Sequence, residues 1–233
     1  MGELEGVRRV ERSIAETARA YDRLAPWYDT IAGTGERRLL DEAVGLLELR
    51  TGEKVLEVGC ATGRGLAQLS VAVGMSGFVS GVDLSAVMLR VAERKLLRAG
   101  AGRCVRLWQG DAKAIACAEG TFDAVLMGFT LELFDTPDIP RVLAECRRAL
   151  RRGGRLCVAA LSRAGGSTVA VRVYEWFHDR MPALADCRPI LVEDSIRNAG
   201  FSIAGVVQRS LSGLPVEIVL STKPGGSDSE HTR

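Results

Sequence analysis

An apolar run, a turn of small residues and the start of a helix follow one another between Val55 and Gly65, in the sequence VLEVGCATGRG. The run Val55–Val58 is short, and helical periodicity resumes near Arg64, which predicts a buried strand leading through a tight turn into a helix. Small side chains keep the turn thin, so that a ligand can approach its backbone. The N–H groups at the start of the helix favour a carboxylate or a phosphate. The turn consists of Gly59, Cys60, Ala61, Thr62 and Gly63.

A carboxylate stands directly before this turn, at Glu57. It can attract a cationic group of a ligand, or it can hold the loop through hydrogen bonds. Because the turn then offers an acid as well as amide donors, we expect a zwitterion rather than a bare pyrophosphate. A dinucleotide fold would need the spacing G-x-G-x-x-G, which the glycines at 59, 63 and 65 do not have.

Composition limits the classes of partner. The chain has 233 residues, enough for one good-sized core, and its length does not require two domains. A formal net charge of +2 gives no reason to expect a nucleic-acid partner. The six cysteines lie far apart without a C-x-x-C pair, so we expect reduced core thiols and no metal site.

The first 50 residues predict a helical cover. Apolar residues recur at helical spacing over 7–21 and again over 39–47, with charged residues between them. The first helix is expected to pack on its own domain or on a second subunit, which makes a homodimer possible. It lacks the apolar run of a signal peptide, and no stretch reaches the roughly 18 apolar residues of a membrane span. We therefore expect a cytoplasmic protein without an integral membrane segment.

Strands and helices then alternate, which predicts a largely parallel sheet covered on both faces, with right-handed crossovers. We expect one domain over 1–223 and a disordered tail over 224–233. The expected strands cover 55–58, 77–83, 105–108, 122–127, 156–161, 201–210 and 216–222.

Several candidate binding residues follow these strands and should meet in one crevice, because ligands of parallel sheets bind beyond the carboxyl ends of the strands. Asp83 can bind two ribose hydroxyls or, like Ser85, cap the next helix. Asp111 can accept a hydrogen bond from an adenine amino group or serve as a turn residue. Leu84 and Met88 can enclose an adenine ring or belong to the core.

The motifs Val55–Gly63, Asp83, Gly110-Asp111-Ala112, Phe122–Val125 and Leu150–Leu156 together resemble a class I S-adenosylmethionine-dependent methyltransferase. The resemblance spans about residues 20–222. It implies a Rossmann-like, doubly wound seven-stranded α/β sheet whose last strand is antiparallel, with a short lid insert after strand five. Ala61 replaces a glycine often found in the family.

The resemblance also implies S-adenosyl-L-methionine as the cofactor and S-adenosyl-L-homocysteine as the product. By motif position, the glycine turn faces the methionine part, Asp83 the ribose, and Asp111 with Ala112 the adenine. Tyr21 and Tyr28, aromatic residues beside acids in a connecting segment, can cover the ligand or simply pack against the domain. The expected cofactor-binding residues are Tyr21, Tyr28, Glu57, Gly59, Cys60, Ala61, Thr62, Gly63, Asp83, Leu84, Met88, Asp111, Ala112, Gly128 and Phe129.

These features predict methyl transfer to a small, hydrophobic or aromatic molecule. Stretches such as Gly77–Leu89 are similar to the ubiquinone and menaquinone C-methyltransferases, although Gly128–Leu133 departs from their pattern. A quinone-precursor C-methyltransferase and a non-catalytic S-adenosylmethionine-binding protein are the alternatives; thiol-based methylation of an arsenical would need cysteines near the methyl group. The candidate catalytic residues, where the family places its acceptor, are Glu132, Tyr174 and His178.

Overall fold

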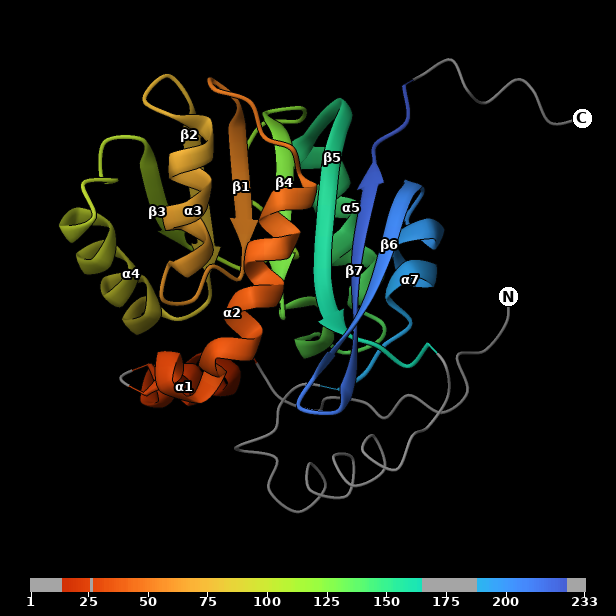
Figure 1. The fold of residues 1–233 in the computed structure, drawn as a ribbon, viewed down its shortest axis with the longest axis horizontal. Coiled ribbons are helices and arrows are strands. Elements are labelled where there is room, and N and C mark those ends of the chain that lie inside the picture. Colours follow the sequence, from red (N-terminus) through yellow and green to blue (C-terminus); the bar gives the residue numbers. More distant parts are fainter. Residues whose placement is uncertain (1–13, 26, 165–187, 226–233) are drawn as a thin grey trace, which may run out of the picture.

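Seven strands form one mixed sheet in the order β3-β2-β1-β4-β5-β7-β6, in a computed structural model that describes residues 14–25, 27–164 and 188–225 (Figure 1). Strands β1 to β5 are parallel, and β7 is antiparallel to both β5 and β6. The Rossmann-like sheet with its antiparallel last strand is thereby confirmed. The strands are β1 (Lys54–Val58), β2 (Phe78–Asp83), β3 (Val105–Gln109), β4 (Phe122–Gly128), β5 (Leu150–Leu161), β6 (Ser202–Leu211) and β7 (Leu214–Thr222).

Helices cover both faces of the sheet. Helices α5 and α7 pack on one face, whereas α2, α3 and α4 pack on the other, where α2 and α3 lie in front of the strands in Figure 1. Helix α1 lies beyond the carboxyl ends of the strands. The described helices are α1 (Ile14–Leu24), α2 (Tyr28–Leu46), α3 (Arg64–Val73), α4 (Ala86–Arg98), α5 (Ile139–Ala149) and α7 (Val192–Asn198), with a 3-10 turn η1 (Leu131–Leu133).

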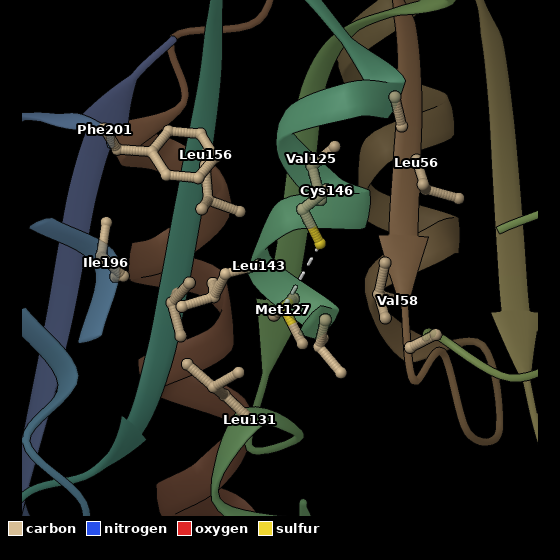
Figure 2. Close-up of a cluster of buried hydrophobic side chains, with 14 of the residues drawn as sticks. Leu56, Val58, Val125, Met127, Leu131, Leu143, Cys146, Leu156, Ile196 and Phe201 are labelled. Atoms are coloured by element: carbon tan, nitrogen blue, oxygen red, sulfur yellow. Dashed lines mark hydrogen bonds between the residues drawn. The ribbon is translucent and has the colours of Figure 1, made fainter. Parts of the chain in front are cut away.

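Side chains of the central strands point alternately to the two faces of the sheet, and they form a hydrophobic core on each face. On β4, Val125 and Met127 face α5, whereas Leu126 faces the α2 and α3 side. All three side chains are fully buried, which is why the central strands read as continuous apolar runs. Figure 2 shows the first of these cores, to which Leu143 of α5, Ile196 of α7 and the residues of β4 all contribute.

Two expected boundaries were wrong. Helix α2 begins at Tyr28, eleven residues before the apolar stretch at 39–47, because a first helical segment precedes Gly33, whose non-helical conformation (φ 66°, ψ -173°) forms a kink between two segments. Strand β5 begins at Leu150, although Arg152-Gly153-Gly154 reads as a turn. Leu150 pairs with Phe122 ahead of an irregularity, and regular pairing resumes at Arg155.

Some expectations concern residues outside the described part of the chain. They are the lid insert after β5, most of the C-terminal tail, and the candidate residues Tyr174 and His178. Within the described ranges, no helix is long and apolar enough to cross a membrane.

Burial predicts how two apolar residues of α3 contribute to stability. Leu69 is fully buried, whereas Val71 is 82% exposed. We expect Leu69→Ala to lower the free energy of unfolding by about 2–5 kcal/mol, because it leaves a cavity. Val71→Ala should change it by less than about 0.5 kcal/mol. Urea denaturation of both variants measures the difference, and equal losses would contradict this packing.

Candidate functional site

A cavity of about 320 Å³ lies at the carboxyl ends of the parallel strands. Val58 ends β1, Asp83 ends β2, Gly110 follows β3 and Phe129 follows β4, and all four line it. The volume is near the lower end of the range for small-molecule sites, about 300–1,000 Å³. The expected cofactor residues that line it are Tyr21, Tyr28, Gly59, Ala61, Asp83, Leu84, Met88, Asp111, Ala112 and Phe129.

Backbone hydrogen bonds fold the glycine turn against the end of β2. The N–H groups of Gly59 and Cys60 both donate to the Val82 carbonyl, at 2.9 and 3.1 Å. Gly59 has a φ of 72°, and a Cβ at this position would lie 2.3 Å from Thr130 Oγ1. Only glycine therefore fits, which brings the backbone of the turn close to the cavity.

Asp83 connects this turn to helix α4. Its Oδ2 accepts the Ala61 N–H at 2.9 Å, and its Oδ1 accepts the Ser85 N–H at 2.8 Å. Burial raises the pKa of Asp83, and these two hydrogen bonds oppose the increase. Ser85 Oγ accepts the Met88 N–H at 3.0 Å, so that Ser85 caps the helix and the Asp83 carboxylate stays at the cavity.

Ala61 occupies the position where the family often has glycine. Its φ is 44°, in the left-handed region that favours glycine, which gives a physical reason for that preference. The Ala61 N–H nevertheless reaches Asp83, so the turn closes with alanine in place.

Asp111 takes part in a charged group where the cavity borders the end of β3. Its Oδ1 accepts the Lys113 N–H at 2.9 Å, so a turn role is present alongside its place in the lining. Lys113 Nζ lies 2.8 Å from Asp138 Oδ2 and 3.9 Å from Asp111 Oδ2. The sequence analysis did not single out Lys113 or Asp138, although Lys113 directly follows Asp111-Ala112.

Glu57 lies behind the glycine turn, with a side chain that is 4% exposed. It accepts a hydrogen bond from the Leu66 N–H, and a Cβ on Gly65 would lie 2.2 Å from its Oε1. Burial, followed by the charge of Asp83, raises the pKa of Glu57 to about 8. Among the described residues its Oε2 has no hydrogen-bond partner.

A second cavity, of about 30 Å³, adjoins the first. It is large enough for water or a small polar group. Three acidic residues from two elements reach it, namely Asp29 and Glu36 of α2 and Glu57 of β1, together with Arg64 at the start of α3. The remaining expected cofactor residues that line this cavity are Cys60, Thr62 and Gly128; Gly63 lies in the turn beside them.

Of the two candidate cysteines for methylation of an arsenical, the structure describes Cys60, which lines the smaller cavity. Burial raises the pKa of Cys60 well above its ordinary value, which keeps it a thiol. Cys187 lies outside the described residues. No group of three or more His, Cys, Asp or Glu side chains is placed to hold a metal in the part of the chain that the structure describes.

Glu132, the candidate base that the structure describes, lines neither cavity. Its side chain is fully buried in η1, and Oε1 accepts the Leu161 N–H at 3.2 Å. Burial raises the pKa of Glu132 to about 8. Its neighbours Thr130 and Leu133 do line the larger cavity. They were not expected from the sequence, because the expected cofactor-binding residues ended at Gly128 and Phe129.

Three comparisons place the chain among known proteins. Residues 55–154 match the family described as "Methyltransferase domain". Nocamycin O-methyltransferase of Saccharothrix syringae is 32% identical over an alignment of 201 residues, which covers 78% of this chain and 70% of that protein. The crystal structure of the cyclase SpnF superposes with a TM-score of 0.75 at 20% identity, covering 92% of this chain and 98% of the other.

A third relative is similar over a shorter stretch. Demethylmenaquinone methyltransferase of Lactococcus lactis is 41% identical over 106 residues, which cover 46% of this chain and 41% of that protein. The chain therefore spans less than half the length of this curated relative. The family match at 55–154 includes the glycine turn and both strand-end acids, Asp83 and Asp111.

The raised pKa of Glu57 predicts a pH dependence of stability. The unfolded chain loses this proton above about pH 4.5, whereas the folded protein keeps it until about pH 8. Stability should therefore decrease as pH rises between these values, by up to about 1.4 kcal/mol per unit from this group. Glu57→Gln should flatten that decrease in urea denaturation, whereas Glu119→Gln, at an exposed site, should not. Parallel curves for parent and Glu57→Gln would contradict the assignment.

Proposed function

This chain belongs to the class I S-adenosylmethionine-dependent methyltransferases, and we propose that it transfers a methyl group to a small, hydrophobic or aromatic molecule. One observation carries the proposal. The glycine turn, Asp83 and Asp111 come from three separate strand ends and line the same cavity. They thereby offer groups for the amino-acid, ribose and adenine parts of one ligand.

The donor supplies a methyl group on a positively charged sulfur, and the residues present fit its other functional groups. Gly59 and Ala61 bring the backbone of the turn to the cavity lining, and Asp83 presents a half-buried carboxylate that suits ribose hydroxyls. The Oε2 of Glu57 lacks a partner among the described residues, which suits an ammonium group held near the turn. Asp111 would meet the adenine amino group.

The acceptor side would act chiefly by positioning. Phe129, Leu133 and Phe134 line the cavity beyond the turn and favour a molecule with an apolar surface. Holding the nucleophile in line with the methyl group can account for roughly 7–11 kcal/mol of the barrier. These side chains would also exclude water from the reacting atoms.

A proton leaves the acceptor in such a reaction, and three residues remain candidates to take it. Glu132 is buried with a raised pKa, so it would be largely protonated near neutral pH and would act only after deprotonation or through a neighbour. Tyr174 and His178 belong to residues 165–187, outside the described structure. A homodimer through the N-terminal helix also stays a prediction.

Two alternatives have specific support. Similarity to the demethylmenaquinone methyltransferase of Lactococcus lactis favours a quinone-precursor C-methyltransferase. The position of Glu132, the candidate base among the described residues, outside the cavity lining favours a protein that binds S-adenosylmethionine without methyl transfer.

Cofactor binding tests the shared part of these proposals. We expect S-adenosylhomocysteine to bind the parent protein in calorimetric titration. Asp83→Asn should weaken binding by at least about tenfold, because it removes the charged acceptor for the ribose hydroxyls, an effect near 1.4 kcal/mol. Glu93→Gln, on the exposed side of α4, should leave the affinity unchanged. Failure of the parent to bind would refute the proposed function.

Acceptor screening separates the three functions. Purified protein with methyl-labelled S-adenosylmethionine is offered phenols, quinols, amines and thiols. We expect label in a small apolar aromatic acceptor, and Leu133→Ala should reduce kcat/KM for that acceptor while leaving S-adenosylhomocysteine affinity within about twofold. Uptake by demethylated quinols alone would support the first alternative. Tight cofactor binding without uptake by any acceptor would support the second.

A further inference from the structure

A Tyr-Asp pair occurs twice, seven residues apart, at Tyr21-Asp22 and Tyr28-Asp29. The first pair lies in α1 and the second begins α2. Both tyrosines line the 320 Å³ cavity. In each pair, the tyrosine lines the cavity and the aspartate directly after it forms hydrogen bonds to another element of the domain.

Asp22 attaches α1 to the N-terminus of α4. Its Oδ1 accepts the Ser85 Oγ–H at 2.5 Å and the Val87 N–H at 3.3 Å. A carboxylate in this position interacts favourably with the helix dipole as well as with the hydrogen-bond donors. The Ser85 N–H donates to Asp83, so Ser85 joins the Asp22 attachment directly to the expected ribose carboxylate.

Asp29 attaches the start of α2 at a second point. Its Oδ1 accepts the Thr62 Oγ–H at 2.6 Å, within the glycine turn. Its Oδ2 forms an ion pair with Lys95 of α4, and Arg64 Nη2 lies 3.9 Å from Oδ1. Although burial alone would raise it, the pKa of Asp29 is lowered by its contacts with Lys95, Thr62 and Arg64. The attachment is therefore charged at neutral pH.

We propose that Asp22 and Asp29 are positioning residues that form a two-point latch, holding Tyr21 and Tyr28 over bound cofactor. The proposal rests on the proposed function. Helix α1 lies beyond the carboxyl ends of the strands, outside the sheet and its two cores (Figure 1). Release of the cofactor past the tyrosines then requires these two attachments to break, while the sheet stays intact.

A latch predicts an effect on the rate of cofactor dissociation, which a purely structural role does not. Attachments that are formed in the closed state and broken on exit slow dissociation more than they affect association. The effects of the Asp22 and Asp29 attachments should also be coupled, because breaking one attachment lets α1 and α2 move and so weakens the hold of the other. A merely stabilising contact would alter the unfolding midpoint without this kinetic pattern.

The test measures association and dissociation rates of S-adenosylhomocysteine on the full chain by surface plasmon resonance. Asp22→Ala and Asp29→Ala should each accelerate dissociation by about tenfold, with association rates changed by less than about threefold. Asp22→Asn keeps an acceptor oxygen for Ser85 and Val87 and should restore most of the slow dissociation. Arg23→Ala, an exposed change on the same helix, is the matched control and should behave like the parent.

The double variant Asp22→Ala/Asp29→Ala tests the coupling. The fold increase in its dissociation rate should be smaller than the product of the fold increases in the two single variants. A second readout is trypsin cleavage after Arg23, detected by mass spectrometry. S-adenosylhomocysteine should protect this bond in the parent and much less in Asp22→Ala, and this comparison also serves if an alanine variant is too unstable for rate measurements.

The outcomes separate the two proposals. A parent protein that fails to bind S-adenosylhomocysteine overturns the proposed function and the latch together. A parent that binds, with dissociation rates in both aspartate variants equal to that of Arg23→Ala, overturns the latch alone. Faster dissociation that Asp22→Asn does not reverse also overturns it for Asp22, because the acceptor geometry would then not be the cause.

Discussion

The two hydrogen bonds of the Asp83 carboxylate hold the rest of the site in place. One comes from Ala61 in the glycine turn and the other from Ser85 at the start of α4, so a single side chain fixes two elements that belong to different crossovers. A carboxylate in so buried a position needs such donors, because losing one leaves a desolvated charge unsatisfied. The cavity wall, the helix start and the attachment of Asp22 all depend on this arrangement.

Local sequence was sufficient for the features that depend on short-range chemistry. Val55–Val58 and the turn after it are adjacent in the chain, and the end of a parallel strand fixes where Asp83 lies. Features that depend on contacts between distant parts of the chain were harder to predict from the sequence. Gly33 separates two helical segments of α2, of which only the second was expected, and the glycines at 153 and 154 resemble a turn although β5 begins before them. In β5, pairing with β4 outweighed the local preference for a turn.

The candidate site was predicted better for its position than for the orientation of its side chains. Glu57 lies between Leu56 and Val58 on β1, and strand alternation turns it away from them, toward α3. It therefore borders the small acidic cavity instead of the larger one. The family resemblance placed Glu132 near the acceptor, but the 3-10 turn directs its side chain inward, where it accepts the Leu161 N–H. Only the packed structure determines such directions.

The burial of Glu57 has a consequence for how a ligand enters. Near neutral pH this side chain largely retains its proton, because burial raises its pKa to about 8. A ligand that brings a positive charge beside it would favour the ionised form and displace the proton into solvent. Ligand capture would then be an exchange of cations, and the heat recorded for it would vary with the ionisation enthalpy of the surrounding buffer.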